Sequence, residues 1–217
     1  MGVAEEKATH NPAANVPKLA VKSDGFHTWT EGEVRQYEAH WPPGTKQRLA
    51  LALLLYAGVR RSDVVRLGRQ MIHDGWLTFK AVKNEEVVTI PILPPLAEEL
   101  AHAPKGQMTF LVTEYGKPFS AAGFGNRFRD WCDKAGLPHC TAHGLRKAAS
   151  SRLAELGASE KQLNAWFGWA DNSNEARRYT KAAQRKRLAE GVARQFSVPR
   201  GDDETKISTL RPRRKRG

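Results

Sequence analysis

The sequence predicts a mainly α-helical fold that also contains a small antiparallel β-sheet, an α+β arrangement. Capping residues recur along the chain, and each precedes a segment of helix length. Two short runs rich in β-branched and aromatic residues, 76–79 and 87–90, flank a polar link, as in an antiparallel hairpin. With 217 residues, the chain is long enough for one well-filled core or two small ones.

Most of the expected helices begin at a residue whose side-chain oxygen can cap the N-terminus. In two of them a Glu or Gln three residues later completes a capping box. The capping residues, in chain order, are Thr30, Thr45, Ser120, Thr141 and Ser159. The helices are expected over residues 31–40, 46–57, 62–67, 95–100, 121–134, 142–156, 160–167 and about 174–196.

The expected sheet is one hairpin. The polar link between its strands covers residues 80–86 and places Lys83 near the tip. Pro91 ends the sheet, because proline cannot donate a ladder hydrogen bond. A further short extended segment is expected over residues 109–113, with a turn at 115–118.

The charge balance points to a polyanionic partner. Lys and Arg number 35 against 23 Asp and Glu, so the net charge is +12 and the isoelectric point is about 10.0. This surplus favours nucleic acid over a membrane surface. The longest apolar run, residues 49–59, is too short to span a bilayer and predicts a buried helix. Residues 1–15 lack the apolar stretch of a secretory signal, so we expect a cytoplasmic protein associated with the bacterial nucleoid.

The two cysteines, Cys132 and Cys140, match neither a metal-binding spacing nor a disulfide framework. We expect both to be free thiols in a reducing compartment, and we expect no metal site.

Composition divides the chain into three parts. Residues 1–24 are polar and aperiodic, so we expect a partly disordered arm or linker. Residues 25–196 are the expected folded domain. Residues 197–217 are expected to be a disordered basic tail, in which 5 of the 6 positions 211–216 are Lys or Arg. The tail either contacts phosphates without sequence preference or stays solvated, and we favour contact.

Two arginines are candidates for binding a phosphate. Arg146 follows His143 by three residues, so the two side chains share one helix face. A guanidinium offers a fork of donors that matches two phosphate oxygens. Arg60 ends the apolar helix, and two such groups would neutralise the charge of a pentacoordinate transition state. Arg61 is adjacent, and spacing alone leaves the choice between Arg60 and Arg61 open.

Three more residues have a functional and a structural interpretation. Lys83 is either a solvated hairpin lysine or a general acid that protonates a leaving oxygen. Tyr179 is either an amphipathic packing residue or a reactive tyrosine, because it follows two arginines and nearby cations favour the phenolate. Trp169 is either a core residue or a donor to a phosphate oxygen. Its indole N–H is a donor only, so it cannot accept and pass on a proton.

Taken together, these residues resemble the catalytic domain of the tyrosine recombinase, or phage integrase, family over residues 29–188. Residues 57–63, Ala-Gly-Val-Arg-Arg-Ser-Asp, resemble the family's T-G-L/M-R-x-S/G-E box, with Asp in place of the usual Glu. This resemblance selects Arg60 over Arg61 as the first catalytic arginine. Residues 143–146, His-Gly-Leu-Arg, resemble the H-x-L-R box.

The remaining boxes follow in the family's order. Lys83, eight residues before Pro91, is similar to the hairpin lysine of the family. Residues 167–169, Phe-Gly-Trp, resemble the L-G-H box, with Trp169 in the third position. Tyr179 matches the nucleophile. Any one box is a weak signal, whereas five in order at compatible spacings are a strong one.

The resemblance implies a site-specific DNA recombinase or integrase that acts on double-stranded DNA by transesterification. Tyr179 would attack a DNA phosphate, which gives a 3′-phosphotyrosyl link and a free 5′-hydroxyl. Rejoining then needs no ATP, metal or other cofactor. The family recombines DNA as a tetramer, and a C-terminal segment such as residues 180–196 often docks on a neighbouring protomer.

The sequence departs from the family pattern in two places. The interval from Trp169 to Tyr179 is 10 residues, one longer than the commonest family spacing, and we expect residues 171–174 to absorb it in a loop. Family members also carry an N-terminal core-binding domain, which we expect this chain to lack. Without that half of the clamp we expect weak, salt-sensitive DNA binding.

Two alternative functions fit the same boxes. One is a non-catalytic DNA-binding or regulatory remnant of an integrase. The other is a nicking-closing enzyme similar to type IB topoisomerases, which would share the chemistry without the need for a second duplex.

Overall fold

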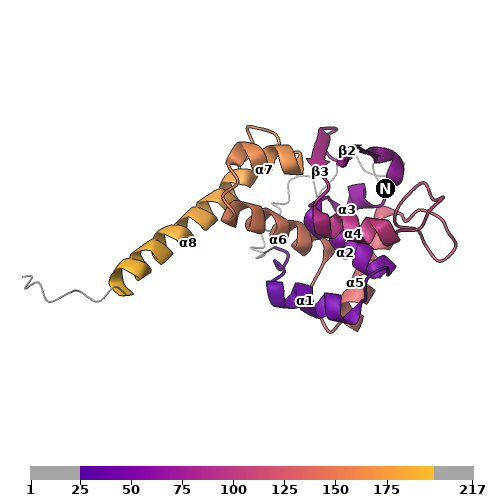
Figure 1. Ribbon diagram of the computed structural model, residues 1–217, viewed down its shortest axis with the longest axis horizontal. Coiled ribbons are helices and arrows are strands. Elements are labelled where there is room, and N and C mark those ends of the chain that lie inside the picture. The colour runs from indigo at the N-terminus through magenta and orange to yellow at the C-terminus, as the bar shows by residue number, and fades with distance from the viewer. Residues whose placement is uncertain (1–24, 198–217) are drawn as a thin grey trace, which may run out of the picture.

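The computed structural model describes residues 25–197. The arm or linker expected over residues 1–24 and the basic residues 211–216 lie outside these described residues. Within residues 25–197 the chain is mostly helical with one three-stranded antiparallel sheet, which confirms the expected fold class (Figure 1).

The helices follow one another in the order that the capping signals predict. Their bounds are α1 Glu31–His40, α2 Lys46–Tyr56, α3 Arg61–Val64, α4 Pro94–His102, α5 Ala121–Lys134, α6 Ala142–Glu155, α7 Glu160–Phe167 and α8 Glu175–Ser197. The strands are β1 Ile72–His73, β2 Trp76–Lys80 and β3 Val87–Pro91, and a short 3-10 turn, Arg69–Met71, precedes β1.

All five expected capping residues accept a hydrogen bond from the backbone of their helix. The capped helices are α1, α2, α5, α6 and α7. Both expected capping boxes are also present, at Thr30 with Glu33 and at Ser159 with Gln162. Local sequence therefore fixes where these helices begin, since each cap satisfies an otherwise unpaired amide.

Three expected elements differ from the prediction by more than one residue. Helix α4, Pro94–His102, is longer than the expected 95–100. Arg60 occupies the N-cap position of the short third helix without a side-chain cap, and this helix ends at Val64, so it starts one residue earlier and is shorter than expected. The segment 109–113 forms only an isolated bridge between Val112 and Pro118, because Phe110 instead donates its amide to the Leu67 carbonyl.

The sequence reasoning missed strand β1. Asp74 and Gly75 both have positive φ, 49° and 78°, and form the two-residue turn that joins β1 to β2. An Asp-Gly pair is the usual sequence signal for such a turn. The sheet order is β1-β2-β3, and the alternate residues Leu77 and Phe79 of β2 are buried.

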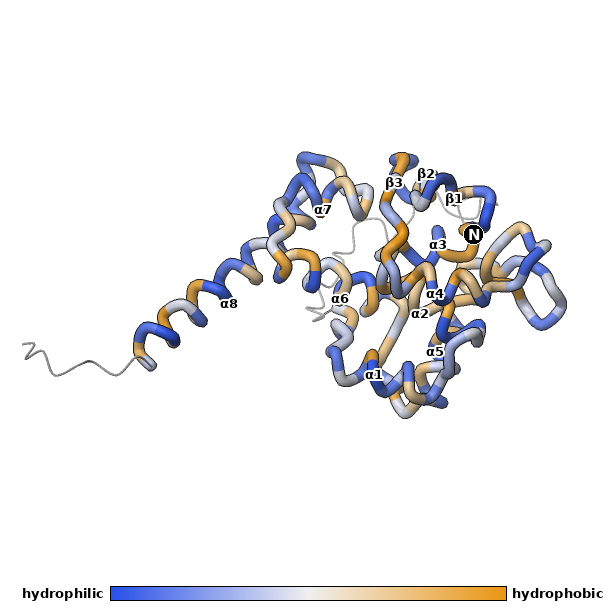
Figure 2. The backbone as a smooth tube through the Cα atoms, in the orientation of Figure 1, coloured by the Kyte–Doolittle hydropathy of each residue, from blue (hydrophilic) through white to orange (hydrophobic). Residues whose placement is uncertain are grey.

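Helix α2 is the centre of the core. Every residue from Leu49 to Leu55 is buried, and α2 packs against both α4 and α6. Aromatic side chains fill the space between α1 and α5: Trp29, Tyr37, Phe124, Phe128 and Trp131. Figure 2 shows the hydrophobic residues of β3, whose inner face joins this core, and the more hydrophilic course of α8.

Helix α8 leaves the body of the protein. Its first turns contact α6 and α7, and the rest projects outward (Figure 1). Among the helices that the structure describes, none is both long and apolar enough to cross a membrane. Cys132 and Cys140 are both buried and free, as expected.

Gly58 carries the chain from α2 to α3 and lies against α7. Its φ is +63°, and a Cβ at this position would overlap the Phe167 ring at the end of α7. The expected left-handed stop at Gly58 is therefore confirmed, and it also permits close contact between two distant segments.

We predict that Gly58→Ala lowers the free energy of unfolding by about 2 kcal/mol more than Gly75→Ala. Both residues have positive φ, but nothing lies within 4 Å of a Cβ at Gly75. Gly75→Ala therefore reports the backbone strain alone, about 1–2 kcal/mol. Urea denaturation measures both values. Adding Phe167→Leu to Gly58→Ala should recover part of the loss, and equal losses for the two glycines would contradict the overlap.

Candidate active site

One cleft of about 510 Å³ brings together residues from six separate parts of the chain. Its walls come from the segment before α1, the start of α3, the β2–β3 turn, α6, the α7–α8 link and the first turns of α8. All six residues singled out from the sequence line it: Arg60, Lys83, His143, Arg146, Trp169 and Tyr179.

Arg146 is the structural centre of this cleft. Its side chain is buried, with the residue 7% exposed, and it donates hydrogen bonds to the carbonyls of Gly58, at 2.5 Å, and Phe167, at 2.9 Å. The guanidinium also lies over the rings of Phe167, 5.0 Å from the centroid, and Trp169, 5.6 Å from the centroid. One side chain of α6 therefore ties the end of α2 to the end of α7.

The charge around Arg146 favours an anion. Burial, together with the nearby charge of Arg60, lowers the pKa of Arg146 to about 9, so the group stays protonated at neutral pH. The residues lining the cleft include five cationic side chains and one carboxylate, Glu175. A buried guanidinium beside other cations gains most from a bound anion, since the anion offsets both repulsion and desolvation.

Arg60 and Arg61 lie in different surroundings. Arg60 is half-buried at the N-cap of α3 and lines the 510 Å³ cleft. Arg61 is exposed, and its guanidinium lies close to Gly125 of α5. Arg61 is absent from the lining of that cleft and contributes to an adjacent one, which Arg60 also lines.

His143 lines the same cleft and lies next to Phe26. The two ring centroids are 4.7 Å apart. Burial lowers the pKa of His143, and the charges of Arg146 and Lys147 lower it further. The imidazole is therefore neutral at pH 7 and able to accept a proton.

The structure corrects one expectation about Tyr179. Burial raises the pKa of its phenol, and Glu175 raises it further, against the opposing effects of Arg178 and Arg146. The phenol is therefore protonated at neutral pH, and the neighbouring cations do not make it a phenolate as the sequence led us to expect. A base has to remove its proton before it attacks.

Trp169 positions the Tyr179 ring. The two rings are parallel within 5°, with centroids 5.7 Å apart. Trp169 in turn stacks on Phe167 at 4.7 Å. This row of rings holds the tyrosine against the arginine that lies over Phe167 and Trp169.

The longer interval before Tyr179 is accommodated in a loop. Between α7 and α8, Ser173 donates its amide to the Ala170 carbonyl, and Asn164 donates its side-chain amide to Asp171 at 3.3 Å. Helix α8 begins at Glu175, and Tyr179 lies one turn later, facing the cleft.

Lys83 is exposed on the β2–β3 turn, and two residues that the sequence analysis did not assign to the site hold this turn in place. Asp63, which is 3% exposed, accepts the Val82 amide at 2.8 Å. Asn84 donates to the Gly168 carbonyl at 2.6 Å. Asp63 belongs to the motif over residues 57–63 that contains Arg60. No sequence motif indicated Asn84, apart from its position beside Lys83.

Two further residues of the cleft were also missed. Lys147 of α6 donates to the Phe26 carbonyl at 2.6 Å, and both residues line the cleft. Phe26 lies in the segment before α1, where the sequence shows no motif. Only the tertiary structure brings this segment over α6.

The fold is that of a tyrosine recombinase catalytic domain. The structure of a lambda integrase dimer bound to a COC′ core site superposes with a TM-score of 0.63 at 23% identity, covering 82% of this chain and 54% of that one. The sequence profile described as Phage integrase family matches residues 33–186. The chain therefore belongs to the phage integrase family.

Two relatives show how much of such a protein the chain represents. The integrase of Mycobacterium phage L5 is 28% identical over 149 residues, which is 56% of this chain and 40% of that protein. The tyrosine recombinase XerC of Herpetosiphon aurantiacus is 23% identical over 178 residues, 72% of this chain and 58% of that protein. The chain thus spans about half the length of the relatives it matches.

We predict that Asp63→Ala releases the β2–β3 turn, because the Val82 amide loses its acceptor. Amide exchange over residues 82–86 should become at least about tenfold faster, the effect of losing roughly 1–3 kcal/mol. Asp63→Asn keeps an oxygen at the same place and is the matched control. Hydrogen–deuterium exchange with mass spectrometry measures this. Equal exchange in both variants would show that the Asp63 oxygen does not hold the turn.

Proposed function

We propose that residues 25–196 form the catalytic domain of a site-specific DNA recombinase that cleaves and rejoins double-stranded DNA. The convergence of two arginines, a lysine, a histidine and a tyrosine on one cationic cleft carries this proposal. Membership of the phage integrase family and the DNA-bound lambda integrase with the same fold support it.

In the proposed reaction, Arg60 and Arg146 bind the non-bridging oxygens of the scissile phosphate. Two guanidinium groups neutralise the charge that develops as the phosphorus becomes pentacoordinate. Arg146 is held by two carbonyls and two aromatic rings before any substrate arrives, so little reorganisation is needed when DNA binds.

The Tyr179 oxygen then attacks the phosphorus. A bond forms between them, and the bond from phosphorus to the 5′ oxygen breaks, which leaves a 3′-phosphotyrosyl link. His143 is neutral and lines the same cleft, so it is the proposed acceptor of the phenol proton. Lys83 donates a proton to the leaving 5′ oxygen, and the reverse sequence rejoins the strand.

Trp169 has a positioning role in this proposal. Its ring fixes the plane of the Tyr179 ring, and its indole N–H is available as a donor to a phosphate oxygen. This chemistry conserves the energy of the phosphodiester bond in the tyrosyl ester, so the proposed reaction needs no cofactor or metal ion at the cleft.

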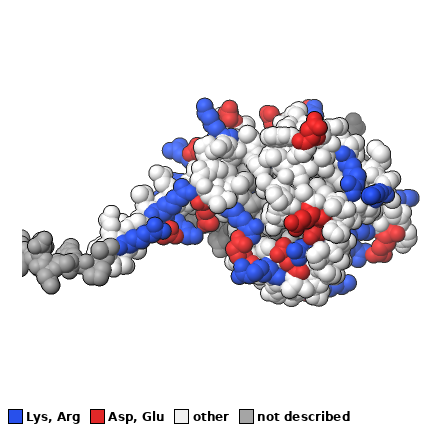
Figure 3. Space-filling view, in the orientation of Figure 1, with Lys and Arg blue, Asp and Glu red and all other residues white. Residues whose placement is uncertain are grey.

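Double-stranded DNA is the proposed partner, and the bacterial nucleoid is the proposed location. Basic residues outnumber acidic ones along α8, with seven Lys or Arg against two Glu. Figure 3 shows basic side chains along this helix, which also carries Tyr179. Contacts of this kind bind phosphates without reading sequence and weaken as salt rises.

We predict that Tyr179→Phe abolishes the covalent protein–DNA product formed on a nicked suicide duplex that carries the cognate site. Phenylalanine keeps the ring that stacks on Trp169, so DNA binding and thermal stability should remain. Denaturing gel electrophoresis detects the product. Tyr115→Phe is the control, since Tyr115 is 88% exposed and lies outside the residues lining the cleft.

Two other outcomes would redirect the proposal. DNA binding by the unaltered protein without a covalent product would support a non-catalytic DNA-binding protein. Relaxation of supercoiled DNA without site preference would support a nicking-closing enzyme similar to type IB topoisomerases.

The outer part of α8 is the proposed contact with a second copy of this chain. Leu188, Val192 and Phe196 recur every four residues along one helix face and are 65%, 51% and 86% exposed. Such an apolar face on a projecting helix fits a groove on a neighbouring protomer. The lambda integrase that shares this fold is a dimer on its core site.

We predict that changing Leu188, Val192 and Phe196 to Ser prevents self-association on DNA. The control changes Glu190 and Arg194 to Ser on the opposite face, which leaves the net charge unchanged. Sedimentation velocity of the DNA-bound protein should show a monomer for the first variant only. Unchanged assembly of the triple variant would place the protomer contact elsewhere.

A further inference from the structure

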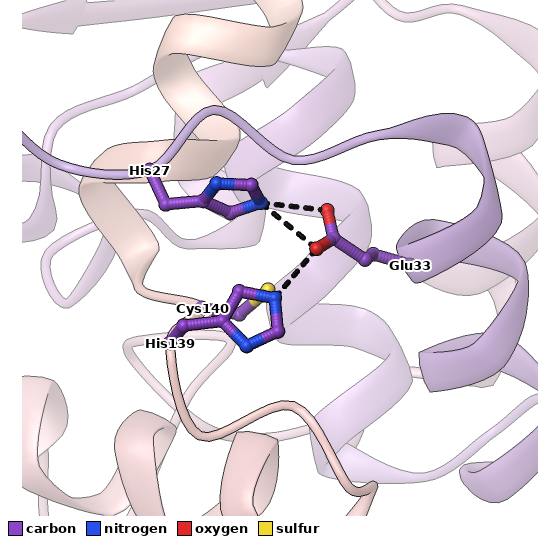
Figure 4. Close-up of side chains that lie close together, drawn as sticks. All are labelled: His27, Glu33, His139 and Cys140. Carbon is purple, nitrogen blue, oxygen red and sulfur yellow. Dashed lines mark hydrogen bonds and ion pairs between the residues drawn. The ribbon is translucent and has the colours of Figure 1, made fainter.

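Four side chains with metal-binding atoms meet outside the catalytic cleft. They are His27 in the segment before α1, Glu33 in α1, and His139 and Cys140 in the loop between α5 and α6. Their ligand atoms all lie within 4.8 Å of one another. Figure 4 shows both imidazoles directed at the Glu33 carboxylate, with the Cys140 sulfur beside His139.

We propose that these four residues form a structural zinc site. Two imidazoles, one thiolate and one carboxylate are the ligand types that Zn²⁺ prefers, and four protein ligands complete its tetrahedral coordination. The thiolate favours zinc over magnesium or calcium, which bind oxygen ligands. The site lies apart from the proposed phosphate chemistry and does not depend on it.

The geometry needs only small side-chain movements to accept the ion. Glu33 Oε1 lies 2.8 Å from the His27 Nε2 atom and 2.6 Å from the His139 Nε2 atom. Neighbouring ligands around zinc are roughly 3.4 Å apart at bond lengths near 2.1 Å. The His27 and His139 side chains are 38% and 52% exposed, so both can rotate by this amount, and an ion can enter between them.

Hydrogen bonds to the backbone hold the segments that carry the two other ligands, Glu33 and Cys140. The second oxygen of Glu33 accepts the Thr30 amide at 2.7 Å as part of the capping box. Cys140 is fully buried, and its amide donates to the Leu137 carbonyl at 3.0 Å. Hydrogen bonds to a metal ligand orient it, so Glu33 and Cys140 are held in place whereas His27 and His139 can rotate.

The cluster also has an interpretation without a metal, as hydrogen bonds among a carboxylate and two imidazoles. Burial acts to raise the pKa of the Glu33 carboxyl, but hydrogen bonds from Thr30, His27 and His139 outweigh it and lower the pKa to about 2. Burial raises the pKa of the Cys140 thiol to about 12, so zinc binding would release the thiol proton to solvent. The Cys140 thiol distinguishes the two interpretations, because it would bind a metal ion but takes no part in the hydrogen bonds between Glu33 and the histidines.

Zinc at this position would connect the segment before α1 to the catalytic cleft. His27 follows Phe26, which packs on His143, and Trp29 donates its indole N–H to the Thr141 carbonyl at 2.9 Å. The ion would hold this segment against both α1 and the loop before α6. One wall of the cleft would therefore be fixed by a metal that takes no part in the reaction.

Cobalt absorption tests the ligand set directly. The full chain, without an affinity tag and stripped with a chelator, is titrated with Co²⁺. We expect saturation at one equivalent, with visible bands of tetrahedral Co²⁺ and a near-ultraviolet thiolate-to-cobalt band, and we expect Zn²⁺ to remove both signals. Cys140→Ser should lose the thiolate band, whereas Cys132→Ser, at the other buried cysteine, should keep it.

Thermal unfolding provides the second test. Zn²⁺ at a hundredfold excess over its dissociation constant should raise the Tm by roughly 5–10 °C. Changing His27 and His139 to Gln should remove this shift, and because both side chains are exposed the variant should still fold. His102→Gln, an exposed histidine of α4, should retain the shift. Zinc should also slow amide exchange over residues 26–29.

The proposal fails if Co²⁺ gives no saturable spectrum and Zn²⁺ does not move the Tm. It also fails if the Cys140→Ser protein keeps the thiolate band, or if Cys132→Ser loses it. Either result would leave a hydrogen-bonded cluster in which the histidines and Glu33 only join three segments of the chain.

Discussion

A buried guanidinium bonded to two backbone carbonyls is the interaction on which the rest of this structure depends. Arg146 bonds the carbonyl of Gly58, which follows α2, and the carbonyl of Phe167, the last residue of α7, and so joins the C-terminal ends of these two helices. An unpaired buried cation would be strongly destabilising. The two carbonyls and the rings of Phe167 and Trp169 stabilise the buried guanidinium. The same bonds bring Arg60 and Trp169, which lie two residues beyond each carbonyl, to the same cleft. Folding and the proposed phosphate binding therefore rely on one side chain.

Electrostatics in the cleft follow from this burial. Burial and the crowded cations keep His143 neutral, and burial beside the aromatic row keeps the Tyr179 phenol protonated. A neutral imidazole and a neutral phenol are the protonation states that proton transfer between them requires. The sequence suggested that neighbouring cations lower the pKa of the phenol, whereas burial raises it, because counting charged neighbours along the chain ignores desolvation.

Local sequence predicted the helices well because capping is a local event. Each Ser or Thr cap bonds an amide three residues away, so its effect does not depend on the rest of the fold. Strand β1 was also readable, from Asp74-Gly75, but was overlooked. The segment 109–113 could not be predicted, since its amide at Phe110 bonds Leu67, more than forty residues earlier, instead of a neighbouring strand. In the cleft, the family boxes identified six lining residues, whereas Phe26, Asn84 and Lys147 carry no local pattern.

The sequence by itself determined where the five capped helices start, the excess of positive charge, and which side chains to propose for phosphate-transfer chemistry in a member of this family. Only the tertiary structure decided which groups meet: Asp63 with the β2–β3 turn, Trp169 with Tyr179, and His27 with Glu33, His139 and Cys140. The physical reason is the distance along the chain over which each kind of interaction acts. Caps, turns and composition act over a few residues. The buried charge of Arg146 depends on a contact 88 residues away along the chain, and the proposed metal-binding cluster on one 106 residues away, and both appear only once the core around α2 has formed.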